Sequence, residues 1–283
     1  MKEPIPIKRN GSWKYIQVQS GLEPQCLDLF HRGEIDGFAL SPHAGFKGTD
    51  VSFLKDAPAL KYLTIANNEH IDISPLPGLN NLRYLALHEI AQAVDLSDLE
   101  RLEILRIDWH KKLILPASNC PIEELYLRSY RPQSKSLAEL PAYPVLKKFE
   151  LVLGNLESLD GIEALRSLEY AELSYLKQLK SINALGRTNI RTLFLDCCKK
   201  VKDYEALRAC KNLKLLILNG QGDIPSLKLI NDVPNLEELR FIKSTITDGD
   251  MTPLLNLKKA AFFKSNHYSH TPEQISQLRR EKQ

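Results

Sequence analysis

A six-residue pattern, apolar-x-x-apolar-x-apolar, recurs along this 283-residue chain at intervals of 20 to 25 residues. A repeat of this length typically contributes one short strand to a parallel sheet and returns through a loop on the other side. A single unit of this size cannot bury its apolar side chains alone, so neighbouring units must stack into one elongated domain. The eleven copies begin at Ile35, Leu60, Leu82, Leu102, Ile122, Leu146, Leu168, Ile190, Leu213, Leu236 and Leu257.

The repeat at residues 60–81 shows how one unit is expected to fold. Leu63 and Ile65 alternate along the strand and point into the core. Asn68 follows at a position where an inward amide can satisfy backbone groups of the turn that leaves the strand. Pro75 disfavours a long helix on the return segment, so we expect short 3-10 turns there.

The segment from Asn68 to Asn81 resembles the short leucine-rich repeat of bacterial internalins, and equally that of the leucine-rich regulatory subunit of protein phosphatase 1. The resemblance extends over residues 35–264. It implies an α/β solenoid, namely a leucine-rich-repeat horseshoe with a curved parallel sheet on its concave face and short 3-10 or irregular segments on its convex face. Other residues replace the inward Asn in several repeats, which predicts irregular turns at Ile90, His110, Tyr130, Leu176, Gln221 and Ser244.

The two ends of the chain do not follow the repeat. A solenoid must cover the apolar side of its terminal units, so we assign residues 1–34 as an N-terminal cap and residues 265–283 as a C-terminal cap around a solenoid of residues 35–264. Thr271, Pro272 and Gln274 form a helix start, and the helix is expected to extend to about Glu281.

The composition is that of a folded intracellular protein. Hydrophobic residues make up 43% of the chain and charged residues 26%, and the formal net charge of +3 argues against a dedicated nucleic-acid binder. No apolar run is long enough for a membrane span, and the N-terminus lacks the apolar core of a secretory signal. We therefore predict a cytoplasmic location. The cysteines show no C-x-x-C pairing and are expected to be reduced: Cys26, Cys120, Cys197, Cys198 and Cys210.

The concave face of the predicted sheet is the candidate binding surface. Three side chains per strand point out of it, including Tyr62 and Tyr84 near the N-terminal end. The middle repeats combine Tyr, Trp, Phe and Arg with carboxylates, a mixture enriched in protein–protein hot spots. The candidate partner-binding residues are Arg106, Asp108, Trp109, Tyr126, Arg128, Glu150, Tyr170, Glu172, Phe194 and Asp196.

Two groups of charges on this face lead to local expectations. His88, Asp108 and Arg128 occupy equivalent positions and should stack as a plus–minus–plus ladder. Glu150 and Glu172 should lie side by side and repel each other. A Lys at position 148 can offset this repulsion in part, and we hypothesise that the Glu pair receives an Arg or Lys from the partner.

No catalytic motif stands out, so the chain is predicted not to be an enzyme. It is predicted to bind another protein without cofactor or metal, as an inhibitor, immunity-type or scaffold protein of bacterial origin, and to bind neither nucleic acid nor membrane. One alternative is a phosphatase-regulatory-like subunit. Another is a metal-dependent enzyme that uses His267 and His270, two histidines three residues apart.

Overall fold

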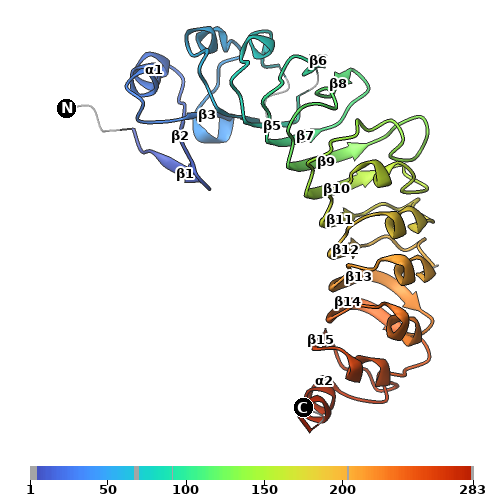
Figure 1. Ribbon diagram of the computed structural model, residues 1–283. Coiled ribbons are helices and arrows are strands. Elements are labelled where there is room, and N and C mark those ends of the chain that lie inside the picture. Colours follow the sequence, from blue (N-terminus) through green and yellow to red (C-terminus); the bar gives the residue numbers. More distant parts are fainter. Residues whose placement is uncertain (1–4, 67–69, 91, 203, 282–283) are drawn as a thin grey trace. The chain divides into compact units, whose positions relative to one another are not determined.

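The computed structural model describes residues 5–66, 70–90, 92–202 and 204–281, and the chain divides into two compact units, Met1–Leu127 and Arg128–Gln283. The first unit contains an α-helix and short 3-10 helices between its N-terminal strands, whereas its described residues from Tyr84 onward form strands without 3-10 helices (Figure 1). Its elements are β1 (Lys8–Asn10), β2 (Trp13–Gln17), α1 (Glu23–His31), β3 (Gly37–Leu40), η1 (Pro42–Ala44), η2 (Ser52–Asp56), β4 (Tyr62–Ala66), η3 (Leu76–Gly78), β5 (Tyr84–His88), β6 (Val94–Asp95), β7 (Ile104–Asp108) and β8 (Leu113–Ile114).

The strand β9 (Glu124–Tyr130) contains the boundary between the units. The second unit repeats one arrangement five times, a strand followed by a 3-10 helix, before a last strand and a terminal α-helix. Its elements are β10 (Lys148–Gly154), η4 (Ile162–Ala164), β11 (Tyr170–Ser174), η5 (Asn183–Arg187), β12 (Thr192–Asp196), η6 (Glu205–Ala209), β13 (Leu215–Ile224), η7 (Lys228–Asp232), β14 (Glu238–Ile246), η8 (Thr252–Asn256), β15 (Lys259–Phe262) and α2 (Pro272–Glu281).

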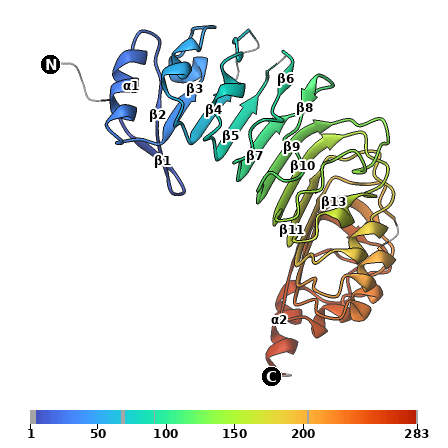
Figure 2. The ribbon, with the colours of Figure 1, turned by 45° about the horizontal axis from the view of Figure 1, so that its top comes forward.

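The strands of the repeats pair in parallel and in sequence order within each unit. In the first unit, β2, β3, β4, β5 and β7 are successive neighbours, and β1 pairs with β2 in the antiparallel direction. In the second unit, β10 to β15 pair without a break. Figure 2 shows the 3-10 turns of the second unit along one side of its strands, to the right in this view. The predicted leucine-rich-repeat fold, including the 3-10 return segments, is confirmed.

The alternation of side chains places the core on one side of each sheet. Leu63, Leu85 and Leu105 occupy equivalent register positions and are completely buried. Leu173 and Leu195 repeat this in the second unit. The side chains between and beside these inward residues point to the opposite side of the sheet. We call that side the open face.

In several repeats a residue in the left-handed conformation lies near the end of the strand or directly after it. A positive φ turns the backbone sharply at that point, although non-glycine residues adopt it at a cost. Glycine has this conformation in one repeat and other residues have it in the rest: Glu89, Ser129, Leu153, Tyr175, Cys197, Gly220 and Lys243.

Three different side chains take the role expected for the inward Asn. The Sγ of Cys198 lies 3.3 Å from the Leu173 carbonyl oxygen, and the amide of Gln221 donates to the Leu195 carbonyl at 2.9 Å. The Ser244 hydroxyl likewise donates to the carbonyl of Leu218 at 3.0 Å. At Gln221 the predicted irregularity is confirmed, because the register of β13 and β14 shifts between Asn219 and Gly222, the partner of Ser244. An inward donor of suitable reach still satisfies the strand carbonyl at both positions. The expected Asn68 lies outside the described residues.

The terminal helix α2 begins as the sequence predicts. The Thr271 hydroxyl accepts a hydrogen bond from the Gln274 backbone N–H at 3.3 Å, and the Gln274 side chain accepts one from the Thr271 N–H at 2.8 Å. Ile275 is fully buried against the preceding repeat, and the Arg279 guanidinium donates to the Leu257 carbonyl at 3.4 Å. Within the described part of the chain, no helix is long and apolar enough to cross a membrane.

Candidate functional site

The candidate residues lie on the open face or at its edge, and all of them are half-buried. Those of the first unit come from β7, from the turn directly after it and from the start of β9: Arg106, Asp108, Trp109 and Tyr126. Those of the second unit come from the end of β9 and from β10, β11 and β12: Arg128, Glu150, Tyr170, Glu172, Phe194 and Asp196.

In the first unit, three of these candidate side chains form one cluster with His88. The Arg106 guanidinium lies 4.6 Å from the centroid of the Tyr126 ring, a cation–π arrangement. The His88 ring meets Tyr126 edge-on at 6.1 Å, and its Nδ1 lies 3.3 Å from an Asp108 carboxylate oxygen. The His88–Asp108 step of the expected ladder is therefore confirmed. Arg128, its third member, is the first residue of the other unit.

The N-terminal part of the open face is covered, which corrects the expectation that Tyr62 and Tyr84 are exposed. Tyr62 is 4% and Tyr84 8% exposed. Their rings stack at 4.4 Å, and the Tyr15 ring of β2 stacks on Tyr62 at 4.8 Å. Gly37 lies between Tyr15 and Tyr62 in the register, and a Cβ there would overlap the Tyr62 backbone. Because Gly37 has no side chain, the two rings meet across β3.

In the second unit, Glu150 and Glu172 are direct neighbours in the register, as expected. The Lys148 ammonium lies 2.6 Å from a Glu150 carboxylate oxygen. This contact confirms the prediction that Lys148 offsets part of the repulsion between Glu150 and Glu172. The same ammonium lies 5.6 Å from the Tyr170 ring centroid. The Tyr170 hydroxyl donates to Glu172 at 2.9 Å. Burial, followed by this hydrogen bond, raises the pKa of Tyr170. Each carboxylate thus has a partner within its own unit.

The open face of the second unit also carries an apolar region that the candidate set does not include. Ile217 is the register neighbour of Phe194, and Leu215 lies two residues before it. Ile242 is 40% and Phe263 73% exposed. The continuous apolar run at residues 215–218 could have indicated this region, because a strand with one polar face should alternate apolar and polar residues.

The thiols offer no activated nucleophile. Cys198 is completely buried and its pKa is raised to about 12, with burial as the main cause. Cys197 is half-buried, and burial followed by the neighbouring Asp196 carboxylate raises its pKa also. Thiolates are the reactive form, so these shifts disfavour reaction at neutral pH.

His267 and His270 do not form a metal site with their neighbours. The Nε2 of His267 lies 2.9 Å from the Ile246 carbonyl oxygen, and its Nδ1 lies 2.9 Å from the Ser265 hydroxyl. The Nδ1 of His270 lies 2.9 Å from the Ser269 hydroxyl. In the described residues, no group of three His, Cys, Asp or Glu side chains is placed to hold a metal ion.

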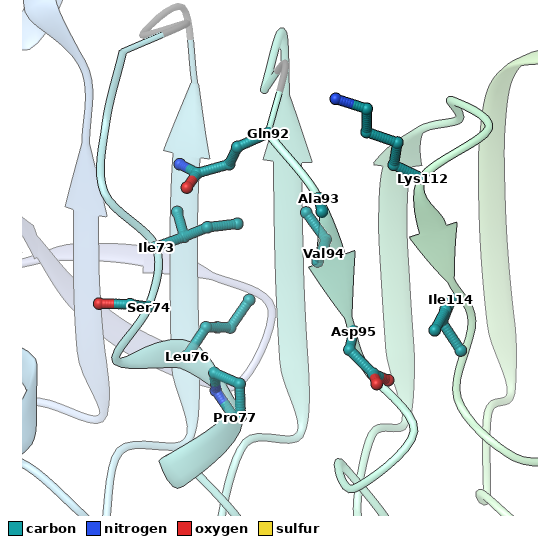
Figure 3. A pocket seen from close by; sticks show the side chains of 10 residues that line it. All are labelled: Ile73, Ser74, Leu76, Pro77, Gln92, Ala93, Val94, Asp95, Lys112 and Ile114. Atoms are coloured by element: carbon teal, nitrogen blue, oxygen red, sulfur yellow. The ribbon is translucent and has the colours of Figure 1, made fainter.

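A cleft of about 320 Å³ lies between Ile73 and the short strands β6 and β8 in the first unit (Figure 3). Gln92 extends toward Ile73 in this view and donates to the Ile71 carbonyl. The remaining lining is mainly apolar, and Lys112 and Asp95 extend in different directions. The polar groups do not converge on one point, so the cleft is a gap between repeats and not a reaction centre.

No protein-family model matches the chain, and no curated protein sequence matches it. Solved structures do resemble it. An internalin (inlF) from Listeria monocytogenes superimposes with a TM-score of 0.60 at 19% identity, covering 94% of this chain and 84% of the internalin chain. The functional domain of InlJ from the same bacterium gives 0.54 at 18% identity, and the match covers 76% of this chain but 47% of the InlJ chain. The chain therefore has the leucine-rich-repeat fold of the internalin type.

Proposed function

We propose that this chain is a non-catalytic protein-binding module that holds its partner against the open face. The proposal rests on the arrangement of Arg106 and Tyr126 within the first unit and of Glu150, Tyr170 and Phe194 within the second. Aromatic and charged side chains are half-exposed at successive rungs of sheets whose strands hold them in fixed register. Such residues contribute most of the binding energy in protein interfaces.

The proposal extends to the way in which the protein acts. A leucine-rich-repeat module without a catalytic site affects its partner by blocking, scaffolding or recruiting it, so an inhibitor, immunity-type or scaffold role follows. The free cysteines are consistent with a reducing cytoplasm. The rival reading of a metal enzyme at His267 and His270 is disfavoured, because both ring nitrogens of His267 already have protein partners.

A capture experiment from a bacterial lysate tests the proposal. The wild-type chain is compared with Tyr126→Ala, Glu150→Ala and Phe194→Ala combined in one variant. The control combines Ile114→Ala, Val145→Ala and Lys211→Ala, which alter exposed residues outside the open face. Circular dichroism verifies that both variants are folded.

We expect the wild type and the control to retain the same protein and the open-face variant to lose it. With the captured protein purified, the open-face variant should bind at least about tenfold more weakly than the control. Equal binding by both variants would exclude the open face as the working surface.

A further inference from the structure

The C-terminal half of the open face in the second unit carries an apolar strip formed by Phe194, Leu215, Ile217, Ile242 and Phe263. The strip runs diagonally, because the register neighbours of Leu215 and Ile217 on β14 are Glu238 and Arg240, which pair with each other at 2.6 Å. It extends from β12 to the residue after β15 within one continuously paired sheet. Phe263, at 73% exposure, is the most exposed of the large apolar side chains in the described residues. An exposed apolar patch rimmed by polar residues commonly marks a binding site.

Charges of opposite sign border the strip at its two ends. Glu172 and Asp196 lie at the β11–β12 end, in the same register rows as Ile217 and Ile242 respectively. Lys243 and Lys264 directly follow Ile242 and Phe263, and Lys259 begins β15. Within the described residues, no ion pair engages any of these five side chains. Glu238 and Arg240 lie between the two ends and offset each other as an ion pair. The side chains without an ion pair therefore make the strip acidic at one end and basic at the other.

The sheet itself restricts the form of a segment that can lie on this strip. The backbone hydrogen-bonding groups of β11 to β15 are directed to neighbouring strands, so the open face offers side chains and no backbone ladder. A segment on this face must satisfy its own backbone groups, and a helix does so. Four strand spacings from β11 to β15 amount to about 19 Å, the length of a helix of about 13 residues.

We propose that the apolar strip binds an amphipathic helix of the partner, with apolar residues along one face, basic residues at one end and acidic residues at the other. The basic end lies over Glu172 and Asp196, and the acidic end lies over Lys243 and Lys259. This inference rests on the proposed protein-binding function and specifies the chemistry of the partner segment.

Three fluorescent helical peptides of about 14 residues serve as probes. Peptide A has acidic residues in its first turn, a Leu/Phe stripe and basic residues in its last turn, an order that also suits the helix dipole. Peptide B has basic residues at both ends, and peptide C has Ser in place of the apolar stripe. Fluorescence anisotropy measures their affinity for the full chain.

We expect peptide A to bind the wild type at least about fivefold more tightly than peptide B, and peptide C not to bind. In the Lys243→Glu, Lys259→Glu variant, the preference should invert in favour of peptide B. Ile242→Ser combined with Phe263→Ser should weaken peptide A at least about tenfold. The matched control is Ile114→Ser, because Ile114 is 54% exposed but lies on β8 of the other unit.

Equal affinity for peptides A and B, an unchanged preference after charge reversal, or no binding of either peptide at ~1 mM would overturn the helix proposal. Wild-type self-association that the Ile242 and Phe263 changes abolish would also overturn it and would assign the strip to a second copy of the chain. The lysate experiment distinguishes failure of the protein-binding function from failure of the helix assignment. If peptide A fails while the open-face variant loses its captured protein, the protein-binding function stands and the helix assignment falls.

Discussion

The left-handed residue near the end of a strand is a site of local backbone strain wherever it is not glycine. Lys243 has a φ of 51°, whereas the equivalent position one repeat earlier is Gly220 with a φ of 60°. A side chain in this conformation costs about 1–2 kcal/mol, and glycine avoids that cost.

Lys243→Gly should therefore raise the free energy of unfolding, by at most about 1 kcal/mol once the greater freedom of glycine in the unfolded chain is counted. Urea denaturation measures the change. Lys243→Ala is the matched control, since it removes the same side chain and keeps the strained Cβ. A gain in Lys243→Ala equal to that in Lys243→Gly would mean that backbone strain is not the cause.

Gln221 leads to a prediction of the opposite sign. It is 1% exposed and donates to the carbonyls of Leu195 and Asn219 at 2.9 and 2.8 Å. Gln221→Ala leaves two carbonyls without this donor, so we expect a loss of about 1–3 kcal/mol in urea denaturation. Gln178→Ala, at an exposed glutamine, should change stability by less than ~0.5 kcal/mol. Equal losses in both variants would contradict the assigned role.

At the scale of the elements, rows of ion pairs link successive repeats. The Glu157 carboxylate lies 2.8 Å from the Lys135 ammonium and 2.7 Å from that of Lys180. These two hydrogen-bonded ammonium groups hold the pKa of Glu157 at about 2, below the usual value for a glutamate. All three side chains are well exposed, so salt should screen the interaction.

This shift gives a defined pH dependence. A carboxyl whose pKa is lower in the folded state stabilises the fold above its unfolded pKa, and the stabilisation is lost as pH falls toward the folded value. Glu157→Gln should lower Tm at pH 7, and the difference from wild type should shrink below about pH 4.5 and vanish near pH 2. Thermal unfolding with Glu100→Gln as control measures it. A difference that stays constant with pH would contradict the assignment.

The strands were predictable from sequence because each is marked by a short pattern of apolar residues within the strand itself. The pattern around Leu63 and Ile65 fixes both the inward positions and the parallel register. The burial of Tyr62 was not predictable, because alternation alone places its ring on the open face. Only the paired β1–β2 hairpin and the bare Gly37 bring Tyr15 onto it. The positions of the candidate residues on the open face follow from the same alternation, whereas their role in binding remains a prediction.

The exchange of Asn for Cys198, Gln221 or Ser244 shows another limit of sequence reasoning. A substitution that breaks the repeat pattern can still place a donor at the same carbonyl, even where the strand register shifts, as at Gln221. Whether the new side chain donates to the carbonyl depends on its length and on how deeply it is buried. The residue type alone does not determine both.

For the whole molecule, each repeat should be stabilised mainly by contacts with its neighbouring repeats, as in other solenoids. α2 packs beside β15 and covers the last repeat of the second unit through Ile275 (Figure 1). This contact supports the proposal that residues 265–283 form a C-terminal cap. The N-terminal cap at residues 1–34 is likewise a proposal.

Ile275→Ala should cost about 2–5 kcal/mol, since it opens a cavity in a buried contact. Hydrogen exchange should show protection lost first in β15 and β14 and retained in β4 and β5. Ile114→Ala, at an exposed isoleucine, should leave the exchange pattern unchanged. Uniform loss of protection in both units after Ile275→Ala would contradict propagation from repeat to repeat.

The uneven burial of the cysteines makes the native chain suitable for labelling. Cys26, Cys120, Cys198 and Cys210 are buried, whereas Cys197 is half-buried directly after Asp196. A maleimide dye should react slowly at neutral pH, because the pKa of Cys197 is raised, and faster and selectively at this residue in alkaline buffer. The dye would then stand at the acidic end of the apolar strip, where its emission would report a docking partner without any engineered residue.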